Sequence, residues 1–162
     1  MPIAGCELQV KVSSVEGKSV TDEWIEAATT THQDHVIAHV IGTTVLGYFV
    51  LRDAIHLLLD IGFVWKIYVD GEMGLLPHPV AVVELEIDEE SLAQLKVDID
   101  LLLNGGDESH LKQFIPLISS GPITEAQIFE RDNERKLSLT GETGIIEIQT
   151  SIKDDLIQLI EG

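Results

Sequence analysis

Alternation of apolar and polar residues predicts β-strands in several parts of the chain. Residues 63–69 place Phe63, Trp65 and Ile67 on one face and polar side chains on the other, and Asp70-Gly71 follows as a hairpin turn signal. The same period of two predicts further strands at residues 7–13, 72–76, 80–87, 126–130, 136–140 and 145–149.

Helical periodicity is clearest in residues 88–103. Asp88 and two glutamates open this segment, Leu95 and Ile99 belong to its apolar stripe, and Asn104-Gly105-Gly106 ends it. Weaker patterns predict helices at residues 50–61 and 109–115, and a closing helix in which Ser151 and Asp154 resemble a capping box.

Residues 31–41 fit two structures. Trp24, Ile25, Ala28, Val36 and Val40 fit one face of a helix running on from Asp22, whereas the many β-branched residues weaken any helix. We favour a strand over residues 35–41, preceded by a short helix over residues 22–28.

Together these elements predict one α+β domain spanning residues 1–162. We expect a mainly antiparallel or mixed sheet of about six or seven strands, with three to five helices packed against it. The clearest internal break signal, Gly121-Pro122, places any subdomain boundary near residues 119–123.

Charge narrows the classes of partner. The chain has 28 acidic and 10 basic side chains, a formal net charge of -18 that opposes binding to nucleic acid and to anionic membranes. Charged residues interrupt the apolar run at residues 36–61, so we expect no membrane span. The single cysteine, Cys6, excludes an internal disulfide framework and agrees with a soluble, cytoplasmic protein.

The most suggestive chemistry is a cluster of three histidines, His32, His35 and His39. In a helix they would fall within an arc of roughly 60° and could share a divalent transition metal such as zinc. A carboxylate from elsewhere, Glu84 or Glu86, would then act as the base. In a strand His32 faces away from the other two, and His35 and His39 lie about 13 Å apart.

A second candidate is His56 with Asp60, which would be neighbours on the surface of a helix over residues 50–61. There His56 could act as a base oriented by Asp60, although a solvated helix face explains the pair as well. The chain contains no P-loop, dinucleotide-binding, nucleophile-elbow or C-x-x-C motif.

Two hypotheses follow. The first, which we favour, is a non-catalytic protein-interaction module without a cofactor, inhibitor-like or antitoxin-like, which contacts a basic protein or its own copy. The alternative is a metal-dependent hydrolase that uses His32, His35 and His39.

Overall fold

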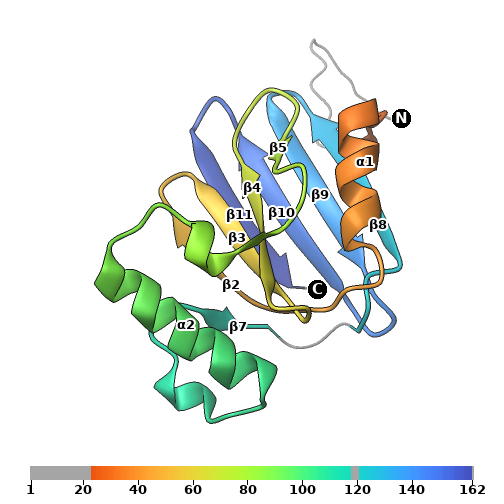
Figure 1. The fold of residues 1–162 in the computed structure, drawn as a ribbon. Helices are drawn as coiled ribbons and strands as arrows, with labels where there is room; N and C mark the ends of the chain where they lie inside the picture. Colours follow the sequence, from red (N-terminus) through yellow and green to blue (C-terminus); the bar gives the residue numbers. More distant parts are fainter. Residues whose placement is uncertain (1–22, 118–120, 162) are drawn as a thin grey trace, which may run out of the picture.

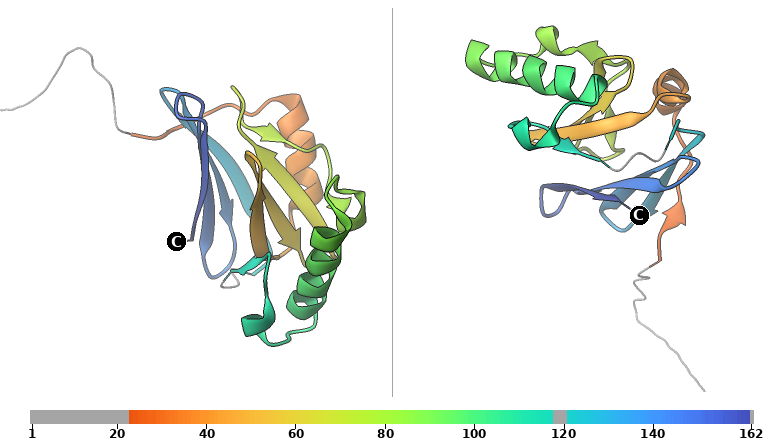
Figure 2. Two further views of the ribbon diagram at one scale, coloured as in Figure 1. Left: turned by 90° about the vertical axis from the view of Figure 1, so that its left-hand side faces the viewer. Right: turned by 90° about the horizontal axis from the view of Figure 1, so that it is seen from below.

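The computed structural model describes residues 23–117 and 121–161, and all of its strand pairs are antiparallel. Two β-sheets pack face to face, and helix α2 lies on the outer side of one of them (Figures 1 and 2). The five-stranded sheet has the order β1 (Ile25–Glu26), β8 (Glu125–Arg131), β9 (Glu134–Thr140), β10 (Ile145–Ser151) and β11 (Leu156–Glu161). The six-stranded sheet has the order β5 (Gly74–Leu75), β4 (Phe63–Tyr68), β3 (Ala54–Leu59), β2 (Val45–Leu51) and β7 (Ile115–Pro116), and β6 (Val80–Ala81) also pairs with β4.

Strand β3 is the centre of the six-stranded sheet and is buried on both faces. Ile55 and Leu57 pack between the two sheets, in one core with residues of β9 and β10. Leu58 points to the opposite face and packs in a second core with Leu95 and Ile99 of α2. The six-stranded sheet is therefore the middle layer of three.

Helix α1 (Thr31–Val40) lies beside β5 and near β8 (Figure 1). Thr30 caps it, because its side chain accepts from the backbone N–H of Gln33 while Gln33 accepts from the backbone N–H of Thr30. Val36 and Val40 enter the core between the sheets. The buried Gln33 side chain also donates to the backbone carbonyls of Glu72 and Met73, in the turn before β5.

Helix α2 (Glu89–Leu103) is capped by Asp88, whose carboxylate accepts from the backbone N–H of Ser91. The short 3-10 turns η2 (Val82–Glu84) and η3 (Glu108–His110) flank it. Leu95 and Ile99 of its apolar stripe are buried, which agrees with the sequence pattern, and Asp98 is buried beside them.

The predicted fold class is wrong. The described residues form two sheets of five and six strands with two α-helices, so the protein is mostly β. The sequence had predicted about six or seven strands in one sheet, with three to five helices against it.

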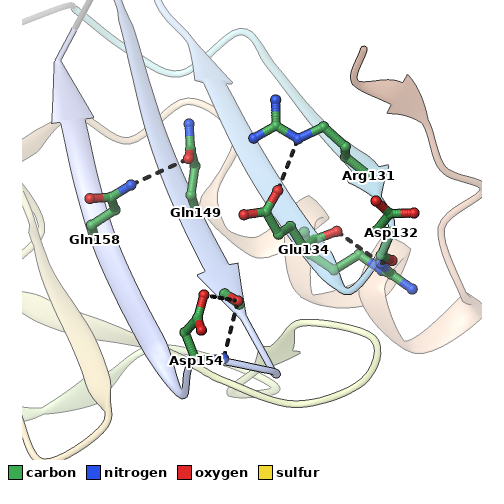
Figure 3. Close-up of polar contacts among 8 residues, drawn as sticks. Arg131, Asp132, Glu134, Gln149, Asp154 and Gln158 are labelled. Carbon is green, nitrogen blue, oxygen red and sulfur yellow. Dashed lines mark hydrogen bonds and ion pairs between the residues drawn. The ribbon is translucent and has the colours of Figure 1, made fainter. Parts of the chain in front are cut away.

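Two of the predicted helices are strands in the structure. The predicted helix at 50–61 is the end of β2, a two-residue turn at Arg52-Asp53, and β3. Because β3 is buried on both faces, its apolar residues do not alternate, and their spacing imitates a helix. The predicted closing helix is β11, and the Ser151–Asp154 contact stabilises the turn between β10 and β11 (Figure 3).

The favoured interpretation of residues 22–41 is also wrong. Residues 25–26 form the short strand β1, and residues 31–40 are helical. The capping box at Thr30 and Gln33, with Val36 and Val40 packed in the core, outweighs the low helix propensity of the β-branched residues.

Two further predictions are partly wrong. The helix predicted at residues 109–115 is the single turn η3 followed by β7, and the strand predicted at residues 80–87 is β6 followed by η2. The strands predicted at residues 63–69, 126–130, 136–140 and 145–149 and the helix at 88–103 are confirmed, and β5 lies within the predicted strand at residues 72–76.

The strand predicted at residues 7–13, together with Cys6, lies outside the described residues, as does part of the predicted boundary at residues 119–123. In the described part of the chain, no helix has the length and apolar character needed to cross a membrane.

Candidate functional site

Helix α1 brings two of its three histidines together. The rings of His35 and His39 meet edge to face, with their centroids 5.7 Å apart. His32 instead lies near β5, where its Nε2 is 3.4 Å from the carbonyl oxygen of Leu75. Among residues 23–117 and 121–161, no three His, Cys, Asp or Glu residues are grouped so that they could hold a metal ion.

The predicted base candidates lie elsewhere. Glu84 and Glu86 are exposed residues in and just after η2, not in a strand over residues 80–87 as predicted. They line a pocket on the outer side of the six-stranded sheet. Asp60 is exposed in the turn after β3, whereas His56 is buried within β3, so the two do not form a pair on a helix surface.

His56 has an unusual environment. It is 2% exposed, its ring stacks on Phe49 with centroids 4.6 Å apart, and it lies opposite Lys66 in the β3–β4 register. Burial, and then the positive charge of Lys66, lower the pKa of His56 to about 4. Nδ1 of His56 is buried and has no hydrogen-bond partner in the described structure. At neutral pH this imidazole is therefore uncharged.

The segment from η2 to η3 is strongly acidic. We define the acidic face as the eight exposed carboxylates Glu84, Glu86, Asp88, Glu89, Glu90, Asp100, Asp107 and Glu108. Within residues 84–108 the only basic side chain other than histidine is Lys96. Figure 2 shows α2, the main element of this segment, on the outside of the six-stranded sheet, away from the five-stranded sheet.

Two carboxylates of the acidic face are held by local hydrogen bonds. The backbone N–H of Ser91, and then its hydroxyl, lower the pKa of Asp88. The backbone N–H of Ser109, and then its hydroxyl, lower the pKa of Asp107. Both side chains therefore stay ionised at neutral pH and add fixed negative charge.

The five-stranded sheet differs from the acidic face, because its basic side chains form ion pairs with carboxylates. Arg131 lies 2.9 Å from Glu134 (Figure 3), and Lys136 lies 3.5 Å from Glu147. Arg135 lies 3.8 Å from Glu130. Negative charge on this sheet is thus partly neutralised, whereas the acidic face has, among the described residues, only the 4.0 Å contact between Asp107 and His110, which is an ion pair only when His110 is protonated.

Apolar side chains accompany the acidic face. Val83 is 57% exposed and Val97 is 53% exposed, and Leu103 at the end of α2 is also exposed. Exposed aliphatic residues among charges are common on protein surfaces, but they also supply the apolar contacts that an interface needs.

Sequence reasoning missed this face as a site. It identified the acidic start of the helix at residues 88–103 but assigned no function to the carboxylates there. One further carboxylate of this helix, Asp98, is fully buried and does not belong to the face. The signal available was the run of eight further acidic residues against a single lysine in residues 84–108.

We compared the chain with protein-family models, with curated proteins and with solved structures, and none of them matched.

Proposed function

We propose that this protein is a non-catalytic protein-interaction module whose acidic face binds a basic protein. The observation that carries the proposal is that residues 84–108 hold eight exposed carboxylates and one lysine, and that α2, the main element of this segment, lies on the side of the molecule away from the paired charges of the five-stranded sheet. A surface of one sign steers an oppositely charged partner and selects against acidic ones.

The exposed apolar residues support the same proposal. Val83 and Val97 would be covered in a complex, while the carboxylates around them would form its polar rim. The net charge of -18 makes a basic partner more favourable than a second copy of this chain. The single cysteine supports placing this function in the cytoplasm.

The test uses a variant that neutralises four carboxylates without removing the caps Asp88 and Asp107: Glu89→Gln, Glu90→Gln, Asp100→Asn and Glu108→Gln. The matched control neutralises four exposed carboxylates in loops and strand ends elsewhere: Asp60→Asn, Glu125→Gln, Asp132→Asn and Glu142→Gln. Both variants have the same net charge, so a difference in their affinity for a partner depends on where the neutralised carboxylates lie.

Proteins captured from source cells by the wild-type chain would be identified by mass spectrometry and purified. Each would then be titrated against the wild type, the acidic-face variant and the control variant. We expect a basic partner that binds the acidic-face variant at least about tenfold more weakly than it binds the control variant. This difference in affinity should become smaller at high salt. Equal affinity for the two variants, or no partner that distinguishes them, would contradict the proposal.

The metal-dependent hydrolase stays a prediction without a supporting geometry. The helical condition for a His32, His35 and His39 site is met, but His32 lies toward Leu75 rather than with the other two. We therefore do not propose it as the function.

A further inference from the structure

A pocket of about 660 Å³ opens on the outer face of the six-stranded sheet, between β3–β4 and η2. This volume is in the range of ligand-binding pockets, which is roughly 300–1,000 Å³. Its wall includes His56, Lys66 and Tyr68 from adjacent strands, and Arg52 from the β2–β3 turn. It therefore gathers a neutral imidazole, two cations and a phenol in one place.

The two cations of the pocket are free to bind an anion. Although the chain has 28 acidic residues, neither Lys66 nor Arg52 forms a salt bridge within the described residues. Lys66 is half-buried, with its ammonium 5.7 Å from the ring centroid of Tyr68. An anionic ligand at Lys66 would supply the close ion pair that its ammonium does not have among the described residues.

Arg52 is held in an unfavourable conformation. Its φ is 57°, a left-handed backbone angle that residues other than glycine, asparagine and aspartate rarely adopt. The tight turn between β2 and β3 imposes this angle and places Arg52 at the pocket rather than in a regular strand. Such strain is found at binding sites more often than elsewhere.

The rest of the pocket sets the size and charge of the ligand. Leu76, Val80 and Leu85 give it an apolar wall. Three carboxylates, those of Asp53, Glu84 and Glu86, also line it, and all three belong to exposed residues. They would repel a multiply charged anion such as phosphate more strongly than a monoanion.

We propose that this pocket binds a small monocarboxylic acid, with its carboxylate against Lys66 and its apolar body against Leu76, Val80 and Leu85. Arg52 attracts the anion at the mouth, and the buried ring of His56 forms part of the wall beside Lys66. The pocket shares Glu84 and Glu86 with the acidic face, but Lys66 and Arg52, which would bind the ligand, lie outside that face, and the four-residue acidic-face variant leaves Glu84 and Glu86 in place.

The experiment titrates the full chain with sodium benzoate, benzamide and inorganic phosphate, and follows backbone amide signals by two-dimensional NMR. We expect saturable shifts at His56, Lys66 and Tyr68 with benzoate. Benzamide has the same shape without the charge, so it should bind at least about tenfold more weakly. Phosphate should not saturate the same signals.

Lys66→Met keeps the apolar stem and removes the charge, and we expect it to weaken benzoate binding at least about tenfold. Lys96→Met is the matched control on the exposed surface of α2 and should bind as the wild type does. The four-residue acidic-face variant should also keep benzoate binding, so failure of this proposal and failure of the proposed function are distinguishable.

Three results would overturn the carboxylate site: no saturation by benzoate, equal binding of benzamide or phosphate, or unchanged affinity in folded Lys66→Met. If Lys66→Met does not fold, the comparison of the three ligands on the wild-type chain decides the question.

Discussion

The carboxylate of Asp98 accepts a hydrogen bond from the backbone N–H of Phe114 at 2.9 Å, and this contact joins α2 to the segment that leads into β7. The same side chain accepts from the backbone N–H groups of Lys112 and Gln113 and from the side-chain amide of Gln94. Asp98 is fully buried, so these donors satisfy a charge that would otherwise be costly.

We therefore expect Asp98→Ala to lower the free energy of unfolding by about 3 kcal/mol, because it leaves several donors unsatisfied. Urea denaturation followed by circular dichroism measures the change. Asp100→Ala is the control, since Asp100 is exposed on the same helix and should change stability by no more than about 0.5 kcal/mol. Similar losses in the two variants would show that the buried network contributes little.

Gly74 packs against the ring of Tyr68 in the neighbouring strand. A Cβ added at Gly74 would lie 1.9 Å from Cε2 of Tyr68, so Gly74→Ala must displace this ring. We expect a loss of about 1–3 kcal/mol in stability and weaker benzoate binding, because Tyr68 lines the pocket.

Gly71→Ala is the matched control for that substitution. Gly71 lies in the same turn region, and a Cβ there would meet nothing within 4 Å. We expect thermal unfolding of Gly71→Ala to match the wild type or to shift slightly upward, because alanine restricts the unfolded chain. If both variants lose the same stability, crowding of Tyr68 is not the cause.

The local pattern of apolar and polar residues was enough to predict the helices and strands that have one apolar and one polar face. Helix α2 has one apolar stripe and an acidic N-terminus, and β8 to β10 are antiparallel strands joined by short loops. The same rules failed for β3, where His56 is surrounded by apolar residues on both faces. Burial on two sides depends on tertiary packing, which a period of two or 3.6 does not encode.

The same limit explains what was missed in the pocket. His56 was identified but assigned to a helix surface, and this placed Asp60 rather than Lys66 beside it. With residues 54–59 taken as a strand, the β3–β4 hairpin register brings His56 opposite Lys66. The position of Arg52 depends on the turn that joins two strands, and no motif in the sequence signals it.

The histidines of α1 allow a direct test of the metal hypothesis. Since only His35 and His39 are adjacent, we expect untagged protein to retain less than stoichiometric metal after purification. Elemental analysis beside a His35→Ala, His39→Ala double variant makes the measurement. Stoichiometric zinc, nickel or iron that is lost in the variant would instead establish a metal site on this helix.

The stability of the protein should depend on pH through His56. Its pKa is about 4 in the folded protein, whereas an exposed imidazole has a pKa near 6.5, so between these values the unfolded chain binds a proton that the folded protein does not. The contribution of the neutral imidazole is complete above pH 6.5 and is lost as the pH falls toward 4. From pH 7 to pH 4.5 we expect a loss of about 2 kcal/mol from this residue. Carboxylates also take up protons in this range, so urea denaturation of His56→Phe, which keeps an aromatic ring beside Phe49, supplies the reference. The wild type should lose about 2 kcal/mol more than His56→Phe over the same pH interval, and parallel losses would show that His56 titrates normally in the folded protein.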